Sequence, residues 1–93
     1  MGFLDKLKDV NEMRKQGKQL ELMLANEEVT GKSSGDKIKI TVDGNQKVKS
    51  VEVDASVAGD KSEVARHIRQ ALEDLTHKHK KMLQSKFGSM MGS

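Results

Sequence analysis

The hydrophobic pattern of the first quarter of the chain has the period of an α-helix. Apolar residues recur at intervals of three, four or seven positions and form one narrow stripe: Phe3, Leu7, Val10, Met13, Leu20 and Leu24. Charged residues of both signs fill the remaining positions, as on a solvated helix face. The pattern predicts a helix over residues 2–25, interrupted by Gly17. A helix of about 36 Å with so narrow an apolar stripe requires a partner to pack against.

The middle of the chain changes to a period of two. Ile38, Ile40 and Val42 alternate with polar residues, which is typical of a strand with one buried face. This pattern predicts a strand over residues 37–43, and the segment before it predicts a weaker first strand over residues 27–33.

The residues Asp43-Gly44-Asn45 are a strong signal for a hairpin turn, so a return strand is expected over residues 47–53. Val48 is followed by Val51 and Val53, and this odd spacing predicts a β-bulge near Lys49-Ser50, which restores the facing. The result is a three-stranded antiparallel meander with one apolar face.

The last part of the chain returns to a helical period, which predicts a second helix over residues 60–86. Asp60 and Glu63 have the spacing of a capping box at its start. Residues 88–93 are rich in glycine and serine and are expected to form a flexible tail. We therefore expect a single domain over residues 1–87, with an α+β fold in the order α-β-β-β-α.

Length and composition limit the class of protein. The 93 residues hold no cysteine, which excludes disulfides and thiolate metal sites. No run of 18 apolar residues and no secretory signal occurs, so we expect a soluble, intracellular protein. The small apolar content favours oligomerisation. The net charge is +3, and the three segments 1–26, 27–54 and 55–93 contribute +1, −1 and +3.

The polar residues give little support for catalysis. His67, His77 and His79 have spacings of ten and two on one helix, which do not suit a shared metal ion, so solvated or anion-facing histidines are expected. The carboxylate pairs Glu27-Glu28 and Glu73-Asp74 have nothing to desolvate them. We expect no enzyme activity, no cofactor, no metal ion and no small-molecule substrate.

The basic residues suggest an anionic partner. On the second helix the candidates for phosphate contacts are Arg66, Arg69, Lys78, Lys80, Lys81 and Lys86; on the first helix they are Lys6, Lys8, Arg14, Lys15 and Lys18. The run 77–81 contains no acid. Since two phenylalanines are the only aromatic residues, a stacking platform for single strands is disfavoured. Duplex DNA held by its backbone fits better.

Four elements then carry a resemblance to a known family: Val29-Thr30-Gly31, the alternating segment 38–42, the turn Asp43-Gly44, and Val51-Glu52-Val53-Asp54. Their order and spacing resemble those of the YbaB/EbfC nucleoid-associated proteins of bacteria, over the whole chain except the tail. Two departures stand out. Ala55 replaces the usual proline, and Glu73-Asp74 replaces an Asn-Asp pair.

The resemblance implies a cytoplasmic homodimer located at the nucleoid, with a central body of sheets and long helices that project like the arms of tweezers. It further implies binding to double-stranded DNA, a role in nucleoid organisation and gene regulation, and the absence of enzymatic activity and cofactors. Composition and spacing alone do not identify DNA.

Two other functions remain open at this stage. A dimeric protein-binding adaptor or chaperone-like module would use the apolar helix stripes and the adaptable side chains of Met13, Met23, Met82, Met90 and Met91. Binding to an anionic membrane surface through the second helix ranks last, because that helix lacks the expected density of tryptophan and leucine.

Overall fold

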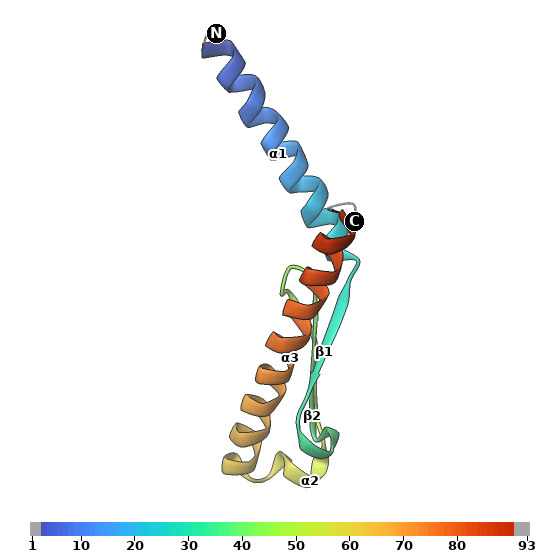
Figure 1. The fold of residues 1–93 in the computed structure, drawn as a ribbon. Coiled ribbons are helices and arrows are strands. Elements are labelled where there is room, and N and C mark those ends of the chain that lie inside the picture. Colours follow the sequence, from blue (N-terminus) through green and yellow to red (C-terminus); the bar gives the residue numbers. More distant parts are fainter. Residues whose placement is uncertain (1–2, 91–93) are drawn as a thin grey trace.

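The computed structural model describes the backbone of residues 3–90 and the side chains of residues 13–88. Its main elements follow the predicted order, which confirms the α+β fold: α1 (Phe3–Ala25), β1 (Glu28–Lys32), β2 (Ile38–Asp43), β3 (Val48–Val53) and α3 (Lys61–Met90) (Figure 1). The sequence pattern did not predict two short elements in the connections, the 3-10 turn η1 (Ser34–Asp36) and the helix α2 (Ala55–Ala58).

The three strands form the predicted antiparallel meander, in the order β1-β2-β3. Ile38, Ile40 and Val42 on the central strand are all buried, as the alternation indicated. On the opposite face, the hydroxyls of Thr30 and Thr41 lie 2.9 Å apart and join β1 to β2. The sheet therefore has one apolar face and one polar face.

The predicted bulge is present at the expected place. Thr41 on β2 pairs with Ser50 on β3, whereas the next residue, Val42, pairs with Val48. Lys49 is thus the extra residue of β3. It brings Val48 back to the same face of the sheet as the other two valines of that strand.

The helix α3 packs on the apolar face, over β1 and β2. The buried core cluster consists of Val29, Ile38, Ile40, Val42, Val57, Ala71 and Leu75. Gly31 on β1 allows this close packing. A β-carbon there would collide with the carbonyl oxygen of Ala71 and would lie 2.5 Å from the β-carbon of Leu75. Only glycine lets the strand approach the helix this closely.

The predicted turn between β2 and β3 is built around Asp43. Its carboxylate accepts hydrogen bonds from the backbone N–H groups of Asn45, at 2.8 Å, and Lys47, at 3.0 Å. The left-handed conformation in this turn falls on Gln46, with φ of 66°, and not on Gly44. Gly44 is required for another reason, because a side chain there would collide with the carbonyl oxygen of Leu24 at the end of α1.

The start of α3 is capped by Asp60. Its carboxylate accepts hydrogen bonds from the backbone N–H groups of Ser62, at 3.0 Å, and Glu63, at 3.2 Å. Only this half of the predicted capping box forms, since the Glu63 carboxylate pairs with Arg66 instead.

At its C-terminal end, α3 runs through Met90, beyond the predicted end at residue 86. Gly88 costs the helix only about 1 kcal/mol, and no proline stops it. Of the expected tail, residues 91–93 lie outside the described part.

The molecule is elongated. Its radius of gyration is 18.7 Å, against about 12 Å for a compact domain of this length, and its extents are 64 × 29 × 18 Å. Figure 1 shows the cause: α1 leaves the packed body as a single projecting arm, and its C-terminal end lies next to that of α3. The DNA-binding candidates on α1 are therefore carried away from the core.

Candidate nucleic-acid interface

The arm formed by α1 exposes three of the predicted cations, Arg14, Lys15 and Lys18. Within residues 13–88, none of the three forms an ion pair with an acidic side chain. Lys6 and Lys8 lie farther along the same helix, but their side chains fall outside the described residues. The arm thus carries positive charge that the described side chains do not neutralise.

The helix α3 exposes three more predicted cations, Arg69, Lys80 and Lys81. Among the described side chains, they too form no ion pair. Lys80 and Lys81 lie in the C-terminal half of α3, the half that runs toward the base of the α1 arm (Figure 1).

The other three predicted cations on α3 are engaged within the chain. The Lys78 ammonium lies 2.8 Å from the Asp74 carboxylate and donates to the carbonyl of Thr30 at 3.2 Å. A second pair, between Lys86 and Glu27 at 2.6 Å, joins α3 to the segment after α1. Arg66 lies 2.7 Å from Glu63. These three pairs reduce the charge available to a ligand.

The pKa values of the partner carboxyls reflect these contacts. The pKa of Asp74 is lowered, first by the hydrogen bond from Lys78 and then by the backbone N–H of Lys32, which donates to the same carboxylate at 2.9 Å. The pKa of Glu63 is lowered mainly by its hydrogen bond with Arg66. Both carboxylates are therefore held in the charged form that keeps their basic partners engaged.

The expectation of solvated or anion-facing histidines was wrong for two of the three. His67 and His79 are buried, with only 4% and 7% of their surface exposed, whereas His77 is exposed. The Nδ1 atom of His67 lies 2.8 Å from the Ser33 hydroxyl, and the Nε2 atom of His79 lies 2.8 Å from the carbonyl oxygen of Gly44. Both face the sheet because their helical positions coincide with the buried stripe of α3.

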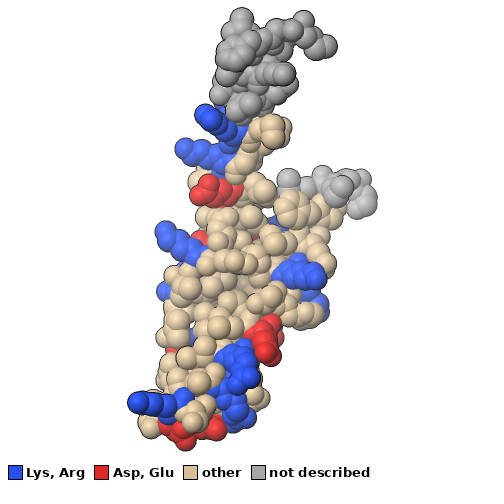
Figure 2. Space-filling model, turned by 90° about the vertical axis from the view of Figure 1, so that its left-hand side faces the viewer, with Lys and Arg blue, Asp and Glu red and all other residues tan. Residues whose placement is uncertain are grey.

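The acid-free run 77–81 consequently does not form one continuous basic patch. The side chains of Lys78 and His79 turn toward the sheet, which leaves Lys80 and Lys81 as the outward cations of the run. Figure 2 agrees with a distributed charge. On the face it shows, lysine and arginine side chains occur along the length of the molecule, with acidic side chains between them.

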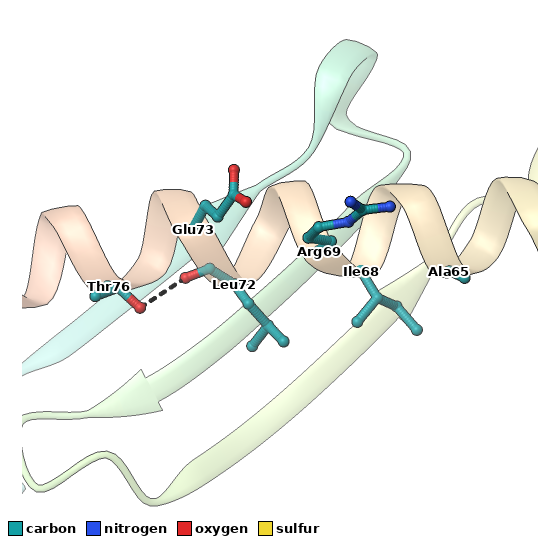
Figure 3. Close-up of a pocket in the computed structure, with 6 residues that line it drawn as sticks. All are labelled: Ala65, Ile68, Arg69, Leu72, Glu73 and Thr76. Atoms are coloured by element: carbon teal, nitrogen blue, oxygen red, sulfur yellow. Dashed lines mark hydrogen bonds between the residues drawn. The ribbon is translucent and has the colours of Figure 1, made fainter.

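An apolar groove lies between α3 and β3. Because α3 covers β1 and β2, the three valines of β3 remain exposed: Val48 by 60%, Val51 by 54% and Val53 by 44%. On α3, Ile68 and Leu72 line the neighbouring hollow and point from the same side of the helix (Figure 3). Leu72 and Thr76 also line the hollow that Val48 borders, so the two hollows adjoin along α3. The sequence pattern had placed these valines on the apolar face of the sheet, and the structure shows that α3 leaves this part of the face uncovered.

Two oppositely charged side chains border this groove. Arg69 and Glu73 lie four residues apart on α3, and Figure 3 shows both turned away from Ile68 and Leu72. Neither forms an ion pair with a described side chain of its own chain.

The described residues form neither a metal centre nor a membrane span. Within the described residues, no three histidine, aspartate or glutamate side chains lie close enough together to hold a metal ion. In the same part of the chain, no helix has the length and apolar character needed to cross a membrane.

Known proteins resemble this chain both in sequence and in fold. The sequence profile of the YbaB/EbfC DNA-binding family matches residues 1–93. A nucleoid-associated protein of Hahella chejuensis is 34% identical over 87 residues, which cover 92% of this chain and 81% of the relative. The crystal structure of an uncharacterized protein from Helicobacter pylori superposes with a TM-score of 0.76 at 23% identity and covers 99% of both chains, which shows a shared fold.

Proposed function

The chain belongs to the YbaB/EbfC DNA-binding family, and we propose that it is a nucleoid-associated protein that binds double-stranded DNA mainly through backbone phosphates. Its similarity to the nucleoid-associated protein of Hahella chejuensis supports this role. The protein would act at the nucleoid in the cytoplasm, in nucleoid organisation and gene regulation. This function requires neither a cofactor nor a small-molecule substrate.

The observation that carries the proposal is a set of exposed cations without acidic partners among the described side chains, distributed over an elongated molecule: Arg14, Lys15, Lys18, Lys80 and Lys81. Measured along α1 from Arg14 to its end and along α3 from its end back to Lys80, these cations cover roughly 30 Å, which matches about nine base pairs of duplex. Charges spread over that length suit the regular repeat of backbone phosphates better than a compact anion. Such contacts position a protein on DNA without reading sequence.

Fluorescence anisotropy with labelled random-sequence duplex DNA tests this function. Since phosphate contacts release counterions, binding that is tight at about 50 mM salt should weaken by orders of magnitude at about 200 mM. A random duplex and a second, unrelated duplex should bind with similar affinity. Absence of binding at both salt concentrations would contradict the proposal.

We further propose that the protein is a homodimer and that a second copy covers the apolar groove between α3 and β3. Exposed valines on an edge strand and exposed Ile68 and Leu72 beside them are unusual for a monomer, because such a surface promotes association. A chain of 93 residues with a small core gains stability by burying them.

The charges at the groove favour a second copy over an unrelated partner. In an antiparallel, two-fold arrangement of the two α3 helices, Arg69 of one chain faces Glu73 of the partner subunit, and the reverse pair forms by symmetry. Leu72 then lies close to the two-fold axis. The groove is thus self-complementary in charge as well as apolar.

Replacement of Leu72 by aspartate tests the location of the interface. The side chain is half-exposed in the single chain, so L72D should leave the fold intact by circular dichroism. It should convert the dimer to a monomer in sedimentation equilibrium, because a charge would be buried at the axis. The matched control is S50D, which introduces the same charge at an exposed position on the polar face of the sheet. A dimer that survives L72D, or a parent protein that is monomeric, would contradict the proposed interface.

A second candidate function, a protein-binding adaptor, is favoured by a shallow apolar groove on α1. Met13, Gly17, Leu20 and Met23 line it, and Met13 is 68% exposed. Methionine side chains suit adaptable contacts with other proteins. The same anisotropy experiment separates the two candidates, because an adaptor would show no salt-dependent affinity for duplex DNA.

A further inference from the structure

The junction between α1 and the body determines where the arm points. Within the described residues, the extensive contacts between elements all lie among the strands, α2 and α3. The direction of α1 therefore depends on a few contacts near its C-terminal end. Among the described residues, the hydrogen bonds from the body to this end come from the turn between β2 and β3, and an ion pair joins Glu27, just after α1, to Lys86.

The turn holds the end of α1 through two hydrogen bonds. The backbone N–H of Gly44 donates to the carbonyl oxygen of Leu24 at 2.9 Å, and the side-chain amide of Asn45 donates to the carbonyl oxygen of Glu21 at 2.8 Å. Because residues 21 and 24 are almost one helical turn apart, the helix is held at two points along its length. Two points restrict its direction, whereas a single point would act as a pivot.

Helix α3 holds this β2–β3 turn from the opposite side. The buried His79 places its Nε2 atom 2.8 Å from the carbonyl oxygen of Gly44, which can only accept, so Nε2 carries the proton and donates. The Nδ1 atom is then an acceptor, 3.3 Å from the side-chain amide of Gln46. Both contacts are satisfied by the same neutral tautomer. The imidazole therefore fixes Gly44, one of the two turn residues that hydrogen-bond to the end of α1.

We propose that Asn45 and His79 are positioning residues: together they fix the angle at which the α1 arm leaves the body. The role of this angle in DNA binding rests on the function proposed above. The effect is amplified by length, since about 21 residues between Leu24 and Phe3 span about 31 Å. A change of 10° at the junction would move the far end of the arm by about 5 Å, which is more than the length of a hydrogen bond to phosphate.

The angle can be measured directly and without DNA. The chain has no cysteine, so two spin labels can be attached specifically, at K18C on the arm and at K39C on the polar face of β2. Double electron–electron resonance then reports the distribution of distances between arm and body. Labelled protein is diluted with an excess of unlabelled protein, so that only distances within one chain are recorded.

Asn45 provides the main test because its side chain is exposed and its removal leaves the core untouched. N45A should broaden the distance distribution by about 2 Å for each 10° of added freedom at the junction, because Lys18 lies about 9 Å along α1 from Leu24, with an unchanged free energy of unfolding for the body. The matched control is N26A. Asn26 also donates to a carbonyl near the end of α1, that of Leu22 at 3.4 Å, but this bond stays within the segment and does not reach the body. N26A should leave the distribution unchanged.

His79 provides a second, independent comparison. H79L removes the donor to Gly44 and should broaden the distribution, whereas H79Q retains a donor at a similar distance and should restore much of the parent width. Distributions of equal width in the parent, N45A and N26A would overturn the proposal. Broadening in a protein that fails to bind DNA would contradict the proposed function and leave the positioning role intact.

Discussion

The buried imidazole of His67 on α3 lies 2.8 Å from the hydroxyl of Ser33, and the same hydroxyl accepts a hydrogen bond from the backbone N–H of Ile38 at 2.9 Å. One side chain from the loop after β1 thus joins α3 to the start of β2. Since all three groups are buried and hydrogen-bonded, His67 is part of the folded core and not part of the DNA surface.

This relationship predicts unequal effects of two histidine substitutions. H67A should lower the free energy of unfolding by about 2–3 kcal/mol, because it removes one of the two hydrogen bonds of the buried Ser33 hydroxyl and opens a cavity. H77A, at an exposed position on the same helix, should change it by less than about 0.5 kcal/mol. Urea titration followed by circular dichroism measures both. Equal effects would contradict the assignment of His67 to the core.

Two glycines should respond to alanine in opposite directions. G31A should destabilise the protein by about 3 kcal/mol, since the new methyl group collides with the Ala71 carbonyl and pushes α3 away from β1. G17A meets no atom within 4 Å and lies inside α1, so it should raise helix content and stability by up to about 1 kcal/mol. The measurement is thermal unfolding. A neutral G31A would show that β1 and α3 are not closely packed.

The ion pair between Lys78 and Asp74 predicts a dependence of stability on pH. The pKa of Asp74 is lowered in the folded state, first by Lys78 and then by the backbone N–H of Lys32. Its contribution to stability is therefore present above the pKa of the unfolded state, about 4, and is lost as the pH falls through the folded-state value. D74N should be less stable than the parent at pH 6, and the difference should shrink below about pH 4. If the difference in free energy of unfolding between the parent and D74N stays constant over this pH range, the ionised Asp74 carboxylate does not contribute to stability in this way.

Charge reversal tests the proposed contact across the dimer axis. R69E should weaken the dimer by about tenfold, because it places two like charges opposite each other at both symmetric positions. The double variant R69E/E73R exchanges the two signs and should recover most of the affinity. Sedimentation equilibrium gives the dissociation constants. Failure of the double variant to recover would show that Arg69 and Glu73 of the partner subunit do not face each other, and Arg69 would return to the DNA-binding candidates.

Much of the fold could be predicted because local patterns and global packing agree. The alternation of Ile38, Ile40 and Val42 fixed the buried face of β2, and the irregular spacing after Val48 located the bulge at Lys49. The turn after Asp43 was equally clear from its residues. These features depend on neighbours close in sequence, which a single sequence displays.

The features that were missed depend on contacts between distant segments. The direction of each α3 side chain relative to the sheet decides whether a polar residue is exposed. Composition therefore could not show that His79 and Lys78 contact the sheet whereas Lys80 is exposed. The exposure of the β3 valines follows from the width of one helix, which covers two strands and leaves the third uncovered. A buried histidine gives no sequence signal beyond its place in the helical period.

The central claim is that duplex DNA binds to the exposed cations that have no acidic partner among the described side chains. Salt titrations of DNA binding by anisotropy should compare K80A/K81A with K78A/K86A, a pair of variants with equal charge loss. K80A/K81A should lower the slope of log affinity against log salt by up to about 4 per dimer, since each lost phosphate contact removes about 0.9. K78A/K86A should change it much less, because Asp74 and Glu27 already engage those lysines. Equal reductions by the two variants would contradict the claim.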